Sequence, residues 1–359
     1  MPIRANPCVR ILIPGPVSGR RWLVENLLER RRYSATPAVI FALVACFEPQ
    51  ERSCLAETMQ SKIGLTVTAA EQIIQRLIAL SLLVSVEHCE LDERIGRWTR
   101  TRREWASWGW PEAVEYHLTT YDYPFMEMGD GTDRKRMDTY SSAEVDRDRQ
   151  KSYVDAERLQ LPGPHERLAP VPMVAPHRRI DKQPLNFEVL ASMLTLTFAE
   201  IERIKPKWSD APLMRRTSPS GGARHPTEAY VVAECVPGLM PGWYHVKSTP
   251  PELERIRDSV DSVQLRALFP GVYGRAPFMV RAVVILTSVF ERNMYRYREP
   301  RTYRSIHMDA GHLSGTLEML AGSMGIDHFV QYAADEKAVD SALGTHFLEE
   351  GFQLCIALG

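Results

Sequence analysis

Two adjacent glycines preceded by serines make residues 217–228, TSPSGGARHPTE, the most unusual segment of the chain. Gly221 and Gly222 let the backbone adopt conformations that other residues avoid, so the segment can approach a planar ligand closely. Its amides and the hydroxyls of Ser218 and Ser220 can meet the carbonyl and ring-nitrogen edges of such a ligand. No Gly-Lys-Ser/Thr follows and the spacing is not GxGxxG, which argues against a Walker loop and a Rossmann nucleotide site. By itself the segment is equally typical of an ordinary tight turn.

Metal and thiol chemistry find little support in the sequence. The six cysteines are scattered and form no CxxC pair, which argues against a zinc ribbon and a dithiol redox motif. His225, His307 and His312 are too dispersed for a metal site, and no HExxH spacing occurs. We expect His312 to organise its loop, and we expect the cysteines to be reduced structural thiols, most of them buried.

The charge balance and the hydropathy exclude two classes of partner. The chain has 359 residues, with 44 Lys and Arg against 45 Asp and Glu, and so a net charge of −1. No global basic field attracts nucleic acid or anionic lipid. No run approaches the roughly 20 apolar residues of a membrane span, and the first residues do not form a clear signal peptide. We therefore expect a protein of the reducing cytoplasm, without nucleic-acid or membrane partners.

The glycine segment lies in the last of three zones, residues 177–359. Helical and strand patterns alternate in this zone, which predicts an α+β or α/β domain. Residues 228–236, directly after the glycine segment, and residues 276–288 are apolar and rich in β-branched side chains, as in buried central strands. We further expect helices at 185–197 and 312–324, and strands at 243–246, 328–332 and 352–358.

The first zone, residues 1–96, contains three helical patterns and a predicted strand pair. The helices are expected at 37–48, at 53–63, and after a capping box formed by Thr68 and Glu71; the strand pair is expected as a hairpin of 82–86 with 91–95. This order of elements is typical of a winged helix-turn-helix.

The residues of that zone do not favour DNA binding. The helix that would enter a DNA groove offers Glu71, Gln72, Gln75 and Arg76, which carry no net positive charge. A groove reader normally gathers Lys and Arg to neutralise phosphates. We interpret the zone as a protein- or peptide-docking module, and the alternative is a structural appendage.

The second zone, residues 97–176, has an uneven composition. It opens with tryptophans interleaved with arginines, namely Trp98, Trp105, Trp108 and Trp110 with Arg97, Arg100, Arg102 and Arg103. We interpret them as an aromatic wedge between domains with arginine stems lying over it, and nucleobase stacking is the alternative. Residues 129–158 mix charges of both signs and predict a solvated loop, and the prolines in 161–172 predict an extended connector.

Several segments in order resemble the SagB-type dehydrogenases, a branch of the FMN-dependent nitroreductase-like family that acts in the maturation of ribosomally made peptides. They are RTSPSGGARHPTEAY at 216–230, GLMPGWYH at 238–245, YRYREPRTYR at 295–304 with MDAGH at 308–312, and the carboxyl-terminal stretches 343–351 and 356–359. The match covers residues 177–359. The resemblance implies an α+β nitroreductase-like FMN fold, with a mixed central sheet flanked by helices, joined to an amino-terminal winged-helix-like domain.

The same resemblance implies FMN as the cofactor. Arg178 and Arg179 stand where family members carry an arginine pair that binds the phosphate, and Arg304 is a second candidate ligand. The alternative for each of these arginines is a surface ion pair. The loop that would lie against the isoalloxazine ring consists of Ser218, Pro219, Ser220, Gly221 and Gly222.

The acid–base position of the family differs in this chain. Azoline oxidases of the family use a lysine followed by a tyrosine, and the corresponding pair here is Arg296 and Tyr297. Arginine stays protonated and cannot act as a base, but its guanidinium could depress the pKa of the tyrosine and leave a usable phenolate. We therefore expect Tyr297 to be the base and Arg296 its electrostatic partner. The alternatives are an altered or lost activity, and a surface Arg-Tyr pair.

The reaction that the resemblance implies is the two-electron dehydrogenation of a peptide, with azolines oxidised to thiazoles or oxazoles and O2 reoxidising the flavin. The family also implies a homodimer, a leader peptide as substrate, and a cyclodehydratase as a possible partner of the amino-terminal module. Two alternatives remain: a nitroreductase or flavin reductase acting on small molecules, and a non-catalytic binding homologue.

Overall fold

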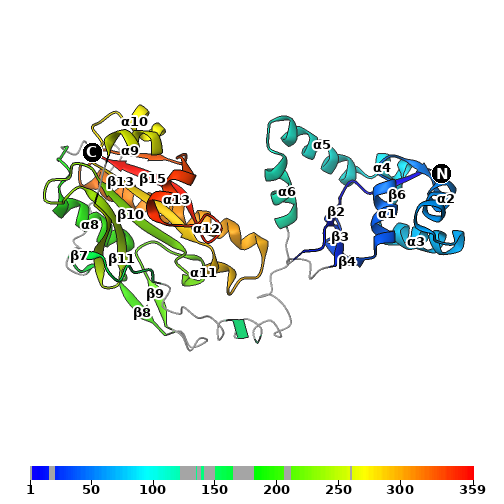
Figure 1. The fold of residues 1–359 in the computed structure, drawn as a ribbon, viewed down its shortest axis with the longest axis horizontal. Coiled ribbons are helices and arrows are strands. Elements are labelled where there is room, and N and C mark those ends of the chain that lie inside the picture. The colour runs from blue at the N-terminus through cyan, green and yellow to red at the C-terminus, as the bar shows by residue number, and fades with distance from the viewer. Residues whose placement is uncertain are drawn as a thin grey trace. The chain divides into compact units, whose positions relative to one another are not determined.

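The computed structural model describes residues 2–15, 21–121, 135, 139–140, 150–164, 182–205, 212–258 and 261–359. Its contacts divide the chain into two compact units, Met1–Pro124 and Phe125–Gly359 (Figure 1). The predicted boundary at residue 96 lies inside a helix and the one at residue 176 lies outside the described residues, so the three-part division stays a prediction.

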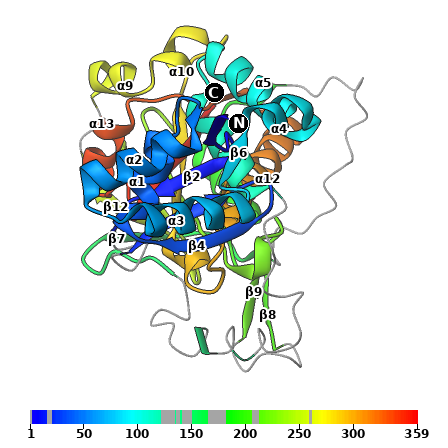
Figure 2. The same ribbon diagram turned by 90° about the vertical axis from the view of Figure 1, so that its right-hand side faces the viewer.

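The first unit combines two small antiparallel sheets with helices. One sheet has the strand order β5 (Gln50–Glu51), β1 (Pro2–Ala5), β6 (Leu83–Ser85), and the other the order β2 (Val9–Leu12), β3 (Trp22–Asn26), β4 (Arg31–Ala35). The helices are α1 (Pro37–Ala45), α2 (Arg52–Ile63), α3 (Val67–Ala79), α4 (Val86–Leu91), α5 (Glu93–Ser107) and α6 (Pro111–Thr120). Helices α1, α2 and α3 pack on one another (Figure 2). They bury the side chains of Leu43, Leu55, Met59 and Ile74.

The three predicted helices of this unit are present, and one predicted cap is wrong. Gly64 ends α2 in the left-handed conformation, with a φ of 70°, as glycine commonly does at helix ends. Helix α3 is capped by Thr66, whose hydroxyl accepts the amide of Ala69 at 3.2 Å. The helix has therefore already begun before Thr68, and the capping box predicted for Thr68 and Glu71 does not form.

The predicted hairpin of 82–86 with 91–95 is also wrong, because local capping turns most of it into helix. The Ser85 hydroxyl accepts the amide of His88 at 3.1 Å and starts α4. The Asp92 carboxylate accepts the amide of Arg94 at 2.8 Å and starts α5. Strand β6 pairs with β1 instead. The winged-helix-like arrangement, in which that hairpin would be the wing, is not confirmed.

The tryptophans of the predicted wedge lie on and between α5 and α6. The Trp105 and Trp110 rings meet edge to face with centroids 5.9 Å apart, and Trp105 also lies 5.6 Å from the His117 ring. Trp108 remains 78% exposed. The role of these side chains as a wedge between domains stays a prediction.

The second unit is built on a seven-stranded sheet. Its strand order is β14 (His328–Gln331), β15 (Glu350–Leu358), β13 (Ala282–Val289), β10 (Thr227–Ala233), β11 (Gly242–Ser248), β12 (Pro251–Arg257), β7 (Glu157–Gln160). The two expected central strands, β10 and β13, are confirmed and pair with each other from Thr227–Ser288 to Ala233–Ala282. Every pairing in this sheet is antiparallel, so the predicted mixed sheet is wrong in this respect. Strands β10, β11 and β12 follow one another as a meander, which imposes that direction.

Helices cover both faces of this sheet, so its central strands bury apolar side chains on both sides. On one face Val231 and Val284 pack against α8 (Phe187–Phe198) and α12 (Tyr303–Ser323). On the other face Val232 and Ile285 pack against α9 (Ser262–Leu268), α10 (Pro270–Arg275) and α13 (Glu336–Leu343). Successive residues of one strand thus enter opposite cores, as the two-residue period of a strand requires. This unit is an α+β fold with the helices on a central sheet.

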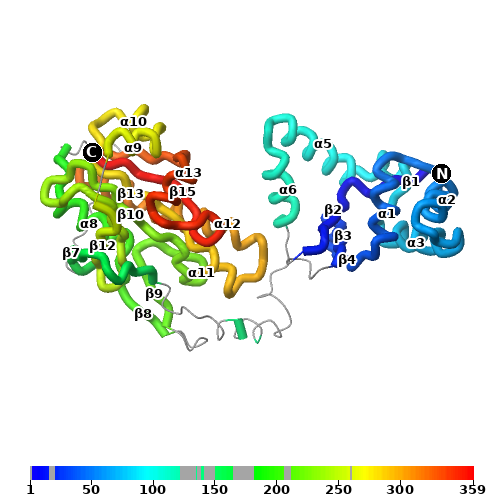
Figure 3. The backbone as a smooth tube through the Cα atoms, viewed as in Figure 1, coloured from blue at the N-terminus to red at the C-terminus, as the bar shows by residue number. Residues whose placement is uncertain are grey.

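Smaller elements surround the glycine segment. The two-stranded sheet of β8 (Glu202–Ile204) and β9 (Leu213–Arg215) precedes it and can be followed in the backbone trace (Figure 3). Helix α11 (Glu291–Met294) and the 3-10 turn η4 (Pro300–Thr302) lie between β13 and α12. Among the described residues no helix is long and apolar enough to cross a membrane. All six cysteines are free, and burial raises the pKa of Cys8 and Cys355 to about 12. The expectation that most of them are buried holds only for Cys8, Cys46 and Cys355, because Cys89 is half-buried and Cys54 and Cys235 are exposed.

Candidate functional site

The glycine segment forms a tight loop between β9 and β10. Gly222 has a φ of 64° and lies within the 3-10 turn η3 (Gly221–Ala223). Ala223 and His225 also have positive φ values, 52° and 45°, which residues with a side chain seldom adopt. Both glycines and Pro219 are exposed, so the loop presents its backbone at the surface of the unit.

Helix α12 holds this loop through polar side chains. The hydroxyls of Ser218 and Thr316 share a hydrogen bond of 2.7 Å. The Ser220 hydroxyl donates to Asp309 Oδ2 at 2.6 Å, and the Gly221 amide donates to Asp309 Oδ1 at 3.2 Å. Burial raises the pKa of Asp309 above its usual value, although these hydrogen bonds oppose the shift. The two serines therefore fasten the loop to α12, and their contact with a flavin ring stays a prediction.

Tyr297 lies directly against the glycine loop. A Cβ atom added to Gly222 would overlap the Tyr297 hydroxyl, so only glycine leaves room for this contact. The Arg296 guanidinium lies 5.6 Å from the centroid of the Tyr297 ring. The fold thus brings together three residues that the sequence analysis singled out from segments about 75 positions apart. Their catalytic roles stay predictions.

Only one of the three predicted phosphate ligands, Arg304, lies within the residues that the structure describes. Arg178 and Arg179 lie outside the described residues. Arg304 is half-buried and occupies the first turn of α12, where the helix dipole favours an anion. That location is compatible with a phosphate ligand, and the assignment of all three arginines stays a prediction.

Two cavities adjoin at Met294 and Leu348. An apolar cavity of about 670 Å³ has Tyr297 in its wall, and the other lining residues are Phe290, Met294, Arg298, Glu299, Pro300, Thr302, Tyr303, Ile306, Phe347 and Leu348. A more polar cavity of about 950 Å³ is lined by residues that include Lys151, Arg292 and Glu350. Both volumes fall in the range of sites for small molecules and cofactors.

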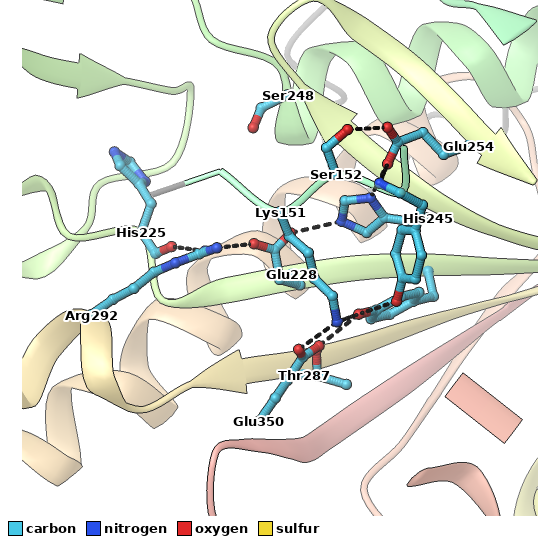
Figure 4. A network of polar contacts seen from close by, with 12 residues as sticks. Lys151, Ser152, His225, Glu228, His245, Ser248, Glu254, Thr287, Arg292 and Glu350 are labelled. Atoms are coloured by element: carbon cyan, nitrogen blue, oxygen red, sulfur yellow. Dashed lines mark hydrogen bonds and ion pairs between the residues drawn. The ribbon is translucent and has the colours of Figure 1, made fainter. Parts of the chain in front are cut away.

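A buried histidine lies between two carboxylates on strands β10, β11 and β12 (Figure 4). His245 Nε2 lies 2.9 Å from Glu228 Oε2, and its Nδ1 lies 2.9 Å from Glu254 Oε2. An ionised carboxylate only accepts hydrogen bonds, so both ring nitrogens must carry protons and the ring is an imidazolium. Burial disfavours that charge, but the two carboxylates outweigh burial and raise the pKa of His245 above its usual value.

The arginine of α11 completes this cluster. Arg292 is 7% exposed, forms an ion pair with Glu228, and donates from Nη1 to the His225 carbonyl at 3.0 Å. Burial alone would raise the pKa of Glu228, but Arg292 and His245 hold it well below its usual range. We call Glu228, His245, Glu254 and Arg292 the buried ion cluster.

A segment from outside the predicted catalytic domain packs onto the same strands. Ser152 donates to Glu254 Oε1 at 2.5 Å, and the Tyr153 amide donates to Glu254 Oε2 at 3.0 Å. Lys151 donates to Glu350 Oε2 and to the Tyr230 hydroxyl, each at 2.7 Å (Figure 4). Residues 150–153 form a loop, as predicted, but buried carboxylates of the sheet bind residues 151–153 and anchor it. The loop prediction is wrong for Glu157 and Arg158, which belong to strand β7.

Sequence reasoning did not identify the buried ion cluster. Glu228 and His245 were quoted within motifs, but no role was assigned to either. A usable signal was present: each interrupts an otherwise apolar buried strand, where a charged residue must have a partner. Lys151 and Glu254 gave no such signal, because both lie in stretches of the sequence that are rich in charged and polar residues.

The three histidines considered for metal binding do not share a site, because each contacts a different part of the fold. His225 Nε2 lies 2.9 Å from the Met214 carbonyl, and His307 Nδ1 lies 2.7 Å from Gln353 Oε1. His312 lies inside α12 and not at the start of a helix, and its backbone carbonyl accepts the Ser218 hydroxyl at 3.3 Å. The role of its side chain in organising the loop stays a prediction. The described part of the chain holds no group of three His, Cys, Asp or Glu side chains arranged to bind a metal ion.

Comparison with known proteins adds a family relationship. The nitroreductase family matches residues 177–359, the range predicted from the motifs. The trifolitoxin-processing protein TfxB of Rhizobium leguminosarum bv. trifolii is 30% identical over 253 residues, which cover 65% of this chain and 66% of TfxB. The nitroreductase-like protein MJ1384 of Methanocaldococcus jannaschii is 31% identical over 113 residues, which cover 31% of this chain and 54% of that protein.

A solved structure supports the fold. The crystal structure of a nitroreductase-like protein from Anabaena variabilis superposes with a TM-score of 0.50 at 23% identity, covering 68% of this chain and 45% of that protein. The chain thus spans just under two thirds of TfxB and less than half of the Anabaena protein. The carboxyl-terminal part of the chain therefore has the predicted nitroreductase-like α+β fold.

Proposed function

Because the chain belongs to the nitroreductase family, we propose that it is an FMN-dependent oxidoreductase that dehydrogenates a peptide during the maturation of ribosomally made peptides. The observation that supports this proposal best is the contact of the Tyr297 hydroxyl with Gly222, in the loop expected to face the flavin. The peptide substrate is supported by the similarity to TfxB, which processes trifolitoxin. More specifically, we propose that the reaction is the oxidation of azolines to thiazoles or oxazoles, with O2 as the terminal oxidant.

The residues of the site fit a flavin. The glycines expose backbone that a ring system can approach. Tyr297, which contacts Gly222, also lines the largely apolar cavity of about 670 Å³. Arg304, with Arg178 and Arg179, would hold the phosphate, and the loop from Ser218 to Gly222 would contact the ring. Bound there, FMN would supply the hydride acceptor that no side chain provides.

Tyr297 has the proton-transfer role in this proposal. Dehydrogenation of an azoline removes a hydride and a proton from neighbouring atoms, so a base must receive the proton. Arg296, over the Tyr297 ring, would stabilise the phenolate by its positive charge. Phe347 and Leu348, which are 62% and 66% exposed at the rim of the apolar cavity, would bind apolar parts of the substrate.

The first unit is proposed to dock the leader peptide or a cyclodehydratase partner. Its α1 and the following turn expose Val44 and Phe47, which are 50% and 61% accessible. Exposed Met308 and Met319 on α12 support the expected homodimer, because large apolar side chains on a helix surface commonly mark an interface. Light scattering of the purified protein measures the oligomeric state.

The visible spectrum and a peptide assay test the proposed function. We expect the purified protein to be yellow or to become so with added FMN, and to remove two hydrogens from an azoline-containing peptide under air. Turnover of a nitroarene with NAD(P)H but not of the peptide would favour a small-molecule reductase. A protein that stays colourless with added FMN would favour a non-catalytic homologue.

A further inference from the structure

Arg292 connects the glycine loop to the buried ion cluster. Its guanidinium donates to the His225 carbonyl at 3.0 Å and pairs with the Glu228 carboxylate, whose other oxygen binds His245 at 2.9 Å. Its own carbonyl accepts Nε of Arg224 at 2.6 Å. Arg292 is therefore held from both ends, between the last residues of the loop and the central strands (Figure 4).

The hydrogen bonds continue through the loop itself. The His225 amide donates to the Ser220 hydroxyl at 2.9 Å, and that hydroxyl donates to Asp309 at 2.6 Å. Between these fixed points, Gly222, Ala223 and His225 have positive φ values of 64°, 52° and 45°. Two of them carry side chains, so this conformation persists only if surrounding contacts determine it.

We propose that Arg292 is a positioning residue that fixes the turn from Gly222 to His225, and with it the exposed backbone edge offered to the cofactor. The identity of that cofactor rests on the proposed function, but the positioning of the loop does not. The planar fork of arginine suits this task, because it binds the carbonyl oxygen of His225 and the carboxylate of Glu228 at the same time. A lysine at position 292 would keep the positive charge but would lose one of these two hydrogen-bond contacts.

Hydrogen exchange of the loop amides tests the positioning. In Arg292→Lys we expect the amides of residues 220–225 to exchange about tenfold faster than in the wild type, the factor that loss of one charge-assisted hydrogen bond would produce. Glu228→Gln, which weakens the anchor of Arg292, should act in the same direction and replaces Arg292→Lys if that variant does not fold. Unchanged loop exchange in a folded variant would overturn the proposal.

Glu252→Gln is the matched control. Glu252 is a buried carboxylate of the same sheet, 4% exposed, but its partners are Lys247 on β11, at 3.0 Å, and Gln160 on β7, away from the loop. The control should lower the melting temperature without accelerating exchange at residues 220–225. If amide exchange at residues 220–225 were equally faster in the control, Arg292 would contribute only to general stability, and the proposal would be overturned.

Titration with FMN, followed by flavin fluorescence, separates this inference from the proposed function. We expect Arg292→Lys to raise the FMN Kd about tenfold, with little change in Glu252→Gln. If the wild type binds no FMN, the proposed function fails while the exchange experiment still decides the positioning role. Faster loop exchange with an unchanged Kd would overturn the claim that this edge serves the cofactor.

Discussion

The glycine loop and the buried ion cluster are adjacent, yet they use polar groups in opposite ways. The loop is exposed at Gly221 and Gly222, and neutral hydroxyls and one carboxylate hold it on α12. The buried ion cluster places charged groups between strands, and His245 is fully excluded from water. Charges in that environment are costly unless each has a partner, whereas the loop can lose a contact to solvent. Changes in the cluster should therefore affect stability first, and changes in the loop should affect function first.

Replacing His245 by Leu should have the largest effect on stability. The substitution leaves Glu228 and Glu254 facing each other without the cation between them, and breaking a buried ion pair in this way costs about 3–5 kcal/mol. Urea denaturation measures the loss of unfolding free energy. His307→Leu is the control, because His307 is exposed. A loss below about 1 kcal/mol would show that the cluster tolerates its unpaired carboxylates.

Replacing Tyr297 by Phe should have the largest effect on function. Removing a general base lowers turnover by about 100-fold or more, while the loss of one hydroxyl from a half-buried side chain costs little stability. Peptide oxidation by the FMN-loaded protein measures turnover, and thermal unfolding checks stability. Full oxidation with FMN retained would remove Tyr297 from its proposed role. It would also weaken the contrast between loop and cluster.

Gly222→Ala should have an intermediate effect on stability. A φ of 64° is unfavourable for a residue with a Cβ atom by about 1–2 kcal/mol. The new methyl group would also overlap the Tyr297 hydroxyl and displace it. We expect weaker FMN binding together with this moderate loss of stability. Gly311→Ala is the control, because no atom lies within 4 Å of a Cβ at Gly311. Equal effects of the two variants would contradict the special role of Gly222.

The smallest effect concerns pH. The pKa of His245 is raised in the folded protein, so its contribution to stability is complete below the unfolded value of about 6.5 and is lost as pH rises through the folded pKa. Glu228 and Glu254 have lowered pKa values, so their contribution is lost as pH falls below about 4.5. The groups that face His245 are these two carboxylates and the rings of Tyr153 and Tyr230. Urea midpoints between pH 5 and 10 should decline more for the wild type than for His245→Leu.

Much of the fold followed from local patterns. The helices 37–48, 53–63 and 185–197 and the central strands were predicted because their apolar periodicity is strong and their packing only reinforces it. The hairpin after residue 82 was predicted wrongly, because Ser85 and Asp92 cap helices there. The mixed sheet was also wrong, since strand direction depends on pairings between distant segments. The contact of Tyr297 with Gly222 could not be read from spacing at all.

By itself, the sequence determined the glycine loop, the apolar strands beside it and the Arg296–Tyr297 pair, because each depends on the chemistry of neighbouring residues. Only the tertiary structure decided that His245 lies between Glu228 and Glu254, and that Lys151 reaches Glu350 across 199 positions. Buried charges obtain their partners from whichever strands the fold brings together. Which buried charged residues form pairs is therefore decided by tertiary packing, and it cannot be predicted from the periodicity of the sequence.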